Sequence, residues 1–309
     1  MFNGLISVAV VFIIFSVGFV FTVKKVWPDN AAGVLSAIVV KVAAPCLAVI
    51  SFYDRLTPEL LKGLLLLIAA GAAHAGCMYV SGKGLSRLLG LSGGRRVMFE
   101  VSFTFSNTIF IGLPVNQIVF GPEGLTSLFA YYIITLAGFW SVGAYEISRA
   151  SPLDGGSGGG FSPRKILSPG LVGVFVGMGV VGLQVHLPVV LDSSIRYLSA
   201  LCVPLSLLVI GSNLSSFARG FSRPKRDELL VMAGKFLISP AFMFAILRAF
   251  GVTGLPFRVL MLTSVMPCHM QASINAQYYG VEGEYAARLV SLSTLLCLVT
   301  IPVSVALLR

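Results

Sequence analysis

Two apolar stretches of the sequence are interrupted by polar residues and prolines, and these interruptions are where chemistry could occur. They read Ser106-Asn-Thr-Ile-Phe-Ile-Gly-Leu-Pro114 and Met266-Pro-Cys-His-Met-Gln-Ala-Ser-Ile-Asn275. Because proline removes a backbone donor and clashes with the preceding turn, we expect each surrounding helix to break near its middle. A new helix N-terminus presents N–H groups and a partial positive charge that suit a carboxylate-sized anion. The alternative is that the prolines only kink the helices and the polar side chains join helices together.

Ionisable residues inside apolar stretches are rare and usually functional. Lys41 lies near the centre of its stretch, whereas Glu100 and Lys235 lie close enough to helix ends to reach the membrane surface. His74 and His269 could carry protons because imidazole titrates near neutral pH, although a lone intramembrane histidine more often joins two helices by a hydrogen bond.

These observations give a set of candidate site residues. The expected substrate-binding residues are Ser106, Asn107, Thr108, Asn116, Gln271, Ser273, Asn275 and Lys41. The expected helix breaks are at Gly112, Pro114 and Pro267, and the candidates for proton or charge coupling are His269, Glu100, Lys235 and His74.

Several function classes are excluded by missing patterns. The chain has no GxxxxGK[ST] loop for ATP and no Ser/His/Asp or HExxH arrangement for hydrolysis, so we expect neither an enzyme nor a cofactor. Neither histidine has the neighbours that a metal site needs. The acidic pair typical of a sodium/proton antiporter core is also missing. The +10 formal charge lies mainly in short loops, which indicates membrane anchoring and not nucleic-acid binding.

The composition predicts an all-α integral membrane protein. Of 309 residues, 56% are hydrophobic and only 11% are charged, and apolar runs long enough to cross a bilayer recur along the chain. We expect ten spans, at about 4–23, 31–53, 60–81, 97–119, 124–147, 166–186, 190–214, 229–250, 255–279 and 284–308. A flexible Gly/Ser linker at 151–165 divides the chain into halves, 1–150 and 166–309.

The two halves resemble each other at a constant offset of 159 residues. This offset brings Pro45 onto Pro204, and Asn116-Gln-Ile-Val-Phe-Gly-Pro-Glu-Gly124 onto Asn275-Ala-Gln-Tyr-Tyr-Gly-Val-Glu-Gly283. Because five spans is an odd number, the second copy must enter the membrane from the opposite side. Such inverted 5+5 repeats are typical of secondary transporters whose site lies near the midplane.

The basic residues predict the orientation. With both termini outside the cytoplasm, most loop lysines and arginines, such as Lys24, Arg95 and Lys225, fall on the cytoplasmic side. We therefore expect a multi-pass protein of the cell membrane.

The two interrupted stretches resemble the auxin efflux carrier family, which contains plant carriers and bacterial permeases of the malate and malonate type. The resemblance rests on Ser106-Asn107, Gly112 and Pro114 in one stretch, and on Met266-Pro267, Ala276, Tyr279 and Gly280 in the other. The chain departs from the family pattern at Cys268-His269, so the resemblance does not carry a substrate identity over to it.

The resemblance implies a fold like that of sodium/proton antiporters or bile-acid symporters, with the broken spans four and nine crossing. It implies an elevator mechanism, a transport core of spans 3–5 and 8–10, a scaffold of spans 1, 2, 6 and 7, and a homodimer. By analogy Asn107 contacts a substrate carboxylate, and Pro114 and Pro267 shape the crossover.

The leading hypothesis is a secondary active transporter of a small organic anion, such as malate, malonate or an auxin-like acid, driven by protons or by membrane potential. Na⁺ remains possible as the coupling ion, because carbonyls at broken helices can hold it. The alternatives are a sodium-coupled organic-anion symporter of the bile-acid type and a membrane sensor that binds a ligand without moving it.

Overall fold

The computed structural model describes residues 2–28, 30–54, 58–152, 169–218 and 223–308. Apart from one isolated bridge, the regular secondary structure of these residues is helical. The predicted linker lies outside the described residues from position 153 onward.

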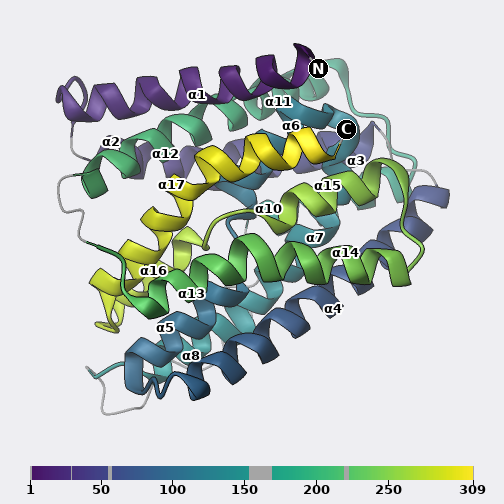
Figure 1. Ribbon diagram of the computed structural model, residues 1–309. Helices are drawn as coiled ribbons and strands as arrows, with labels where there is room; N and C mark the ends of the chain where they lie inside the picture. The colour runs from purple at the N-terminus through teal and green to yellow at the C-terminus, as the bar shows by residue number, and fades with distance from the viewer. Residues whose placement is uncertain (1, 29, 55–57, 153–168, 219–222, 309) are drawn as a thin grey trace.

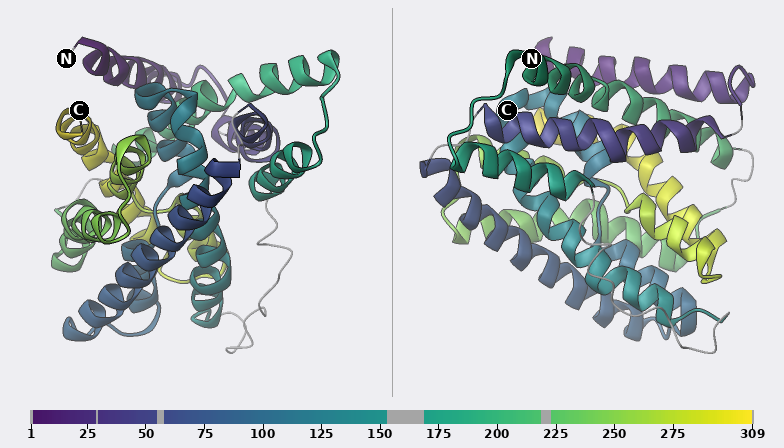
Figure 2. Two further views of the ribbon diagram at one scale, coloured as in Figure 1. Left: turned by 90° about the vertical axis from the view of Figure 1, so that its right-hand side faces the viewer. Right: turned by 180° about the vertical axis from the view of Figure 1, so that it is seen from behind.

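The described helices form two groups (Figures 1 and 2). The first group lies along one side of the molecule and contains α1 (Phe2–Val23), α2 (Ala31–Ile38), η1 (Val39–Ala43), α3 (Ala44–Tyr53), α10 (Pro169–Gly182), α11 (Val189–Ala200) and α12 (Cys202–Ala218). Within it α1 packs on α12, and α3 packs on α10 and α11.

The second group occupies the other side. From the first half of the chain it contains α4 (Pro58–Leu88), α5 (Gly93–Thr104), η2 (Thr108–Gly112), α6 (Leu113–Phe120), η3 (Pro122–Gly124), α7 (Leu125–Gly138), η4 (Phe139–Gly143) and α8 (Ala144–Arg149). From the second half it contains α13 (Arg226–Ala233), η5 (Gly234–Ile238), α14 (Ser239–Ala249), α15 (Gly254–Ser264), α16 (Met270–Tyr278) and α17 (Gly283–Leu307). Helix α4 packs on α5, α7 and α14, and η2 and α6 contact α12 of the first group.

Six helical stretches are long and apolar enough to cross a membrane: Ala31–Tyr53, Gly63–Leu88, Pro122–Arg149, Val189–Leu214, Arg226–Ala249 and Gly283–Leu307. Ala9–Val23, Thr108–Phe120 and Pro169–Gly182 are shorter apolar helices. Two of the remaining predicted spans, 97–119 and 255–279, are interrupted at 105–107 and 265–269. The all-helical membrane prediction is confirmed, and the count of ten stays a prediction.

Prolines shape three of these helices in the same way. The π-turns η1, η2 and η5 each end two residues before a proline: Pro45, Pro114 or Pro240. A proline cannot donate the i→i−4 hydrogen bond and clashes with the carbonyl four residues earlier. The wider turn accommodates this locally, so the helix continues past the proline.

Glycines allow close helix packing in the first group. A side chain at Gly18 would collide with the backbone of Leu208 on α12, and one at Gly211 would collide with the backbone of Phe15 on α1. A Cβ at Gly177 would lie 3.0 Å from the Val49 backbone on α3. Small residues at such contacts are the usual means by which membrane helices associate.

Candidate functional site

The two interrupted helices pair with each other at their breaks. Helix α5 ends at Thr104 and α15 ends at Ser264, and the backbone is extended at Phe105 in the first break and at His269 in the second. The Asn107 backbone N–H donates to the Pro267 carbonyl at 2.8 Å, and the His269 N–H donates to the Phe105 carbonyl at 3.1 Å. Ser106 and Cys268 thereby form an antiparallel bridge, so the two extended segments run in opposite directions. We call this pairing of 105–107 with 267–269 the crossover.

The predicted break residues lie at different positions relative to the crossover. Pro267 is part of it, and its carbonyl accepts the hydrogen bond from Asn107. Gly112 and Pro114 lie inside η2 and α6, beyond the interruption. The first break therefore comes several residues before the proline that predicted it.

Asn107 caps the helix that begins after the first break. Its side-chain Oδ1 accepts a hydrogen bond from the Phe110 N–H at 3.2 Å. The side chain is 1% exposed, and its Nδ2 has no hydrogen-bond partner among the described residues. A buried donor without an acceptor costs about 1–3 kcal/mol. Asn107 is therefore held in place by its oxygen, while its NH₂ group makes no hydrogen bond to the described residues.

Lys235 lies at the crossover, wholly buried. Its Nζ donates to the Phe105 carbonyl at 2.8 Å and to the Ser106 Oγ at 3.0 Å. The sequence placed Lys235 close enough to a helix end to reach the membrane surface, whereas the structure encloses it completely. The ammonium sits at the C-terminal end of α5, where the helix dipole favours a cation.

The other predicted residues around the breaks have buried or half-buried polar side chains. Asn116 is fully buried on α6, where its Nδ2 donates to the Gly112 carbonyl at 2.7 Å and its Oδ1 has no partner among the described residues. The ring of His269 contacts Phe139 edge to face, and its Nδ1 is likewise buried without a partner. The Thr108 hydroxyl lies 3.3 Å from that of Thr135. On α16, Ser273 and Asn275 are buried and Gln271 is half-buried.

A cavity of about 670 Å³ lies between the two helix groups. Ala32 and Ser36 of α2 and Asn213 of α12 line it from the first group. Lining residues from the second group include Ile111, Met270, Ser273, Ile274, Gln277, Glu284, Arg288, Ser291 and Thr294. It therefore reaches both helices that follow the breaks, and its walls are mostly apolar with a few polar groups, as in ligand pockets.

Three predicted residues lie outside this arrangement. Lys41 is exposed on η1, which packs against α10, α11 and α12. Glu100 is buried but paired, accepting from Arg96 at 2.8 Å and from the Ser86 hydroxyl at 2.5 Å. His74 joins three helices, because its Nδ1 lies 3.0 Å from the Tyr131 hydroxyl and its Nε2 lies 3.1 Å from the Ser239 carbonyl.

The hydrogen bonds of His74 also fix its tautomer. The Ser239 hydroxyl already donates to the Ser264 carbonyl, so it can only accept from the imidazole. His74 Nε2 therefore carries the hydrogen, and Nδ1 accepts from Tyr131. This neutral tautomer satisfies both ring nitrogens.

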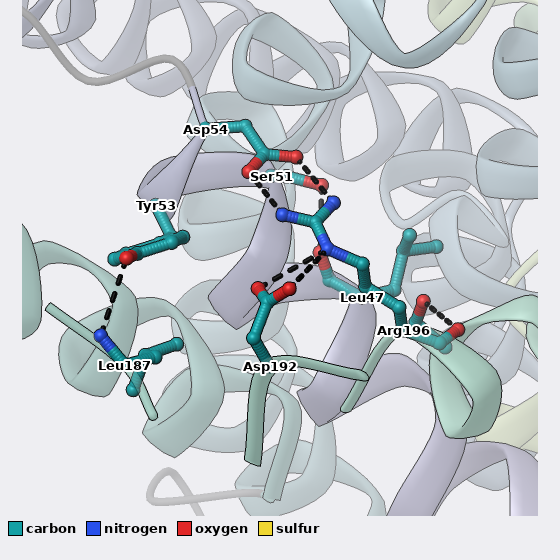
Figure 3. A network of polar contacts seen from close by, with 8 residues as sticks. Leu47, Ser51, Tyr53, Asp54, Leu187, Asp192 and Arg196 are labelled. Carbon is teal, nitrogen blue, oxygen red and sulfur yellow. Dashed lines mark hydrogen bonds and ion pairs between the residues drawn. The ribbon is translucent and has the colours of Figure 1, made fainter. Parts of the chain in front are cut away.

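Two charged clusters were not predicted from the sequence. Figure 3 shows the Arg196 guanidinium between the carboxylates of Asp54 and Asp192, with N–O distances of 2.7 and 2.9 Å in its two ion pairs. This cluster ties the end of α3 to α11. The spacing of Asp192 and Arg196, four residues apart on a helix, could have indicated half of it.

The second cluster ties α13 to α5 and α17. Arg95 pairs with Asp227 at 2.8 Å, and Arg288 pairs with Glu228 at 2.9 Å. Glu228 is 1% exposed and also accepts a hydrogen bond from the Lys225 N–H. The partners of each ion pair are far apart in the sequence, so no local sequence pattern predicts them.

Comparison with known proteins gives one family for the whole chain. A family model described as membrane transport protein matches residues 4–152 and 161–305. An uncharacterized transporter of Methanothermobacter thermautotrophicus is 28% identical over 301 residues, covering 96% of this chain and 95% of the relative. An uncharacterized transporter of Methanocaldococcus jannaschii is 25% identical over 304 residues, covering 95% of each chain.

The family match agrees with the resemblance carried by the two interrupted stretches. It extends over both halves and leaves out only the segment between them and a few terminal residues. The chain therefore belongs to the membrane transport protein family, that of the auxin efflux carriers, and is a multi-pass membrane transporter.

Proposed function

We propose that the protein is a secondary active transporter of a small organic anion, and that the substrate carboxylate binds at the crossover. The observation that carries this proposal is Asn107, whose amide is buried, fixed by its oxygen, and left with an unpartnered NH₂ group. A carboxylate oxygen would accept from that group, as it does in other charge-assisted hydrogen bonds.

The helix ends at the crossover support an anion as the ligand. Two helices begin there, Thr108–Phe120 and α16, and neither has an acidic residue in its first turn. Their N-terminal ends carry partial positive charge and N–H groups that favour an anion. The cavity between the helix groups is lined by Ile111 and Met270, in the first turns of these two helices, which supports entry of the ligand from that cavity.

The proposed substrates are carboxylates such as malate, malonate or an auxin-like acid, and the proposed driving force is a proton gradient or the membrane potential. A sodium-coupled mechanism of the bile-acid type is the second candidate. One observation favours it: Asn116 Oδ1 is a buried oxygen acceptor without a partner among the described residues, and Na⁺ binds oxygen ligands. Strict dependence of uptake on sodium would select this second candidate.

Alternating access is proposed to follow from an inverted repeat. Under the offset of 159 residues, Gly18 corresponds to Gly177 and Leu208 corresponds to Val49, and both pairs are close contacts between a glycine and a backbone. The same offset relates Gly121 to Gly280, which both have positive φ and end the helices after the breaks. These matched contacts support two structurally equivalent halves.

In this proposal the first helix group is the scaffold, and the second is the core that moves like an elevator. The cavity between the groups and the separate packing within each of them support this division. A homodimer through the scaffold is also proposed. The exposed charge of Lys41, midway along Ala31–Tyr53, supports it, because charges at bilayer depth normally face protein or water.

The proposed orientation in the cell membrane places both termini outside. In Figure 1, α1 begins and α17 ends at the same end of the molecule. At the opposite end, α1 and α4 finish and α5 and α13 begin, and these helix ends carry Lys24, Arg87, Arg95 and Arg226. The concentration of basic residues there supports a cytoplasmic location for that end.

The test exchanges the donor of Asn107 for an acceptor without changing its shape. In Asn107→Asp the remaining oxygen can still accept from Phe110, so the helix cap is kept while the NH₂ group is lost. We expect labelled-carboxylate uptake into proteoliposomes to fall at least about tenfold, because hydrogen bonds to charged groups contribute about 1.5–3 kcal/mol. The panel is malate, malonate, succinate and an aromatic acetate, with a pH gradient imposed or collapsed.

Asn107→Ser is the matched control, because serine caps a helix and retains a donor. We expect its uptake to lie between that of the wild type and that of Asn107→Asp. Full activity in Asn107→Asp would show that the carboxylate does not bind at this amide.

A further inference from the structure

The crossover contains one positive charge, that of Lys235, which no acidic side chain among the described residues balances. Lys235 is 0% exposed, and both of its hydrogen-bond partners, the Phe105 carbonyl and the Ser106 hydroxyl, are uncharged. The ion pairs of the described residues do not include it. An ammonium has three N–H donors, so one remains after these two bonds.

The described carboxylates on the helices around Lys235 are already paired with arginines or with a lysine. Helices α4, α5, α13 and α14 pack against η5. The ion pairs on these helices are Arg96 with Glu100, Arg95 with Asp227, Arg288 with Glu228, and Lys83 with Glu146. None of these carboxylates is therefore left to balance Lys235.

Four other titratable side chains lie near Lys235, and none of them is a carboxylate. They are the imidazoles of His74 and His269 and the thiols of Cys268 and Cys297. His74 is satisfied as the neutral tautomer. A protonated His269 would need an acceptor for the buried Nδ1, and no described residue supplies one. The crossover therefore presents one net positive charge in a low-dielectric interior.

We infer that Lys235 is the counter-charge for the substrate and restricts transport to organic anions that carry a single negative charge. This inference rests on the proposed function and narrows its substrates: of the acids proposed there it selects an auxin-like monocarboxylate over malate and malonate, which carry two negative charges at neutral pH. Asn107 follows Ser106, whose hydroxyl binds Lys235, so the ammonium and the unpartnered amide belong to neighbouring residues of one buried segment, and a carboxylate at the amide is attracted by the ammonium through the low-dielectric interior. One negative charge is balanced there, and a second would be buried without compensation.

The binding test compares acids that share one carbon frame and differ in charge. Succinate, succinamate and succinamide carry two, one and no negative charges, and phenylacetate and phenylacetamide form a second pair with an apolar body. Binding is measured at neutral pH as ligand-induced thermal stabilisation of the purified full-length protein. We expect succinamate or phenylacetate to bind at least about tenfold more tightly than succinate and the neutral amides.

Lys235→Gln and Lys235→Arg separate charge from structure. We expect Lys235→Gln to weaken monoanion binding by about 30-fold or more, since loss of one member of a buried charge pair has at least this effect. Lys235→Arg keeps the charge and should keep the preference for a single charge. If Lys235→Gln does not fold, the preference of the wild type and of Lys235→Arg still decides the question.

The outcomes separate this inference from the proposed function. Binding of succinate as tight as that of succinamate, or an unchanged charge preference in Lys235→Gln, would overturn the role of Lys235 and leave an anion transporter. If none of the carboxylates binds to the wild type, the proposed function fails and this inference fails with it.

Discussion

Of the ionisable residues in the two unpredicted clusters, Glu228 is expected to lower the free energy of unfolding most when it is replaced. Its carboxylate accepts from Arg288 at 2.9 and 3.0 Å and from the Lys225 N–H at 2.9 Å. Glu228 lies in the first turn of α13, and its partner Arg288 lies on α17, where it lines the cavity. The ion pair therefore joins the start of α13 to the cavity wall. Glu228→Ala removes all three interactions at once.

The expected loss follows from burial. Removing one partner of a fully buried ion pair costs about 3–5 kcal/mol because the other charge stays buried. The side chain of Glu228 is 1% exposed and that of Arg288 is 17% exposed, so part of the guanidinium can be solvated after the change. We therefore expect Glu228→Ala to lower the free energy of unfolding by about 2–3 kcal/mol, below the fully buried range.

Asp192→Ala is the matched control, because it also removes a carboxylate that forms an ion pair with an arginine. Here the side chains are 27% and 44% exposed, and Arg196 keeps its pair with Asp54. An exposed pair contributes about 0–1 kcal/mol. Equilibrium unfolding in mixed detergent micelles measures both variants. Equal losses in the two variants would refute the argument that burial sets the strength of these clusters.

Two further predictions concern helix packing and His74. Gly177→Leu should destabilise the protein by about 1–3 kcal/mol, because the new side chain overpacks against Val49. Gly179→Leu on the same helix should have little effect, because no atom lies within 4 Å of its Cβ position. Thermal unfolding of the two variants checks this prediction. His74→Phe should reduce stability by about 1–3 kcal/mol, because the buried Tyr131 hydroxyl loses its partner on the imidazole. The pH profile of uptake should keep its shape, and a changed profile would contradict the neutral, structural role of His74.

The sequence predicted the parts of the architecture that depend on composition and local pattern. Apolar runs and few charges predicted an all-helical membrane protein, and the polar interruptions around Asn107 and Pro267 predicted two breaks at nearly the right places. The position of the first break was displaced, because Pro114 is accommodated by the π-turn before it and the chain instead opens at 105–107. The sequence around a proline does not show which turn of the helix will widen to accommodate it.

The roles of single charged residues depend on tertiary packing, so they could not be predicted from where each residue lies along its span. Lys41 lies at the centre of its helix but on the outer surface, while Lys235 lies near a predicted span end but at the centre of the crossover. Distance from the end of a hydrophobic run measures depth only if the helix is neither tilted nor bent. The pairs Arg95–Asp227 and Arg288–Glu228 likewise form between helices that no local signal brings together.

The charges at the crossover support the proposal that this site binds an anion and not a cation. Helices α5 and α15 end there, and Thr108–Phe120 and α16 begin there, so partial charges of both signs meet. Lys235 binds the Phe105 carbonyl and thereby offsets the negative end of α5. No acidic residue in the first turns of Thr108–Phe120 or α16 offsets their positive ends. The balance left at the crossover is positive, and the unpartnered Asn107 amide adds a donor to it. A sodium ion bound there would have to overcome this potential with acceptors such as Asn116 Oδ1, whereas the Lys235 ammonium, the two helix N-termini and the Asn107 amide all attract a carboxylate.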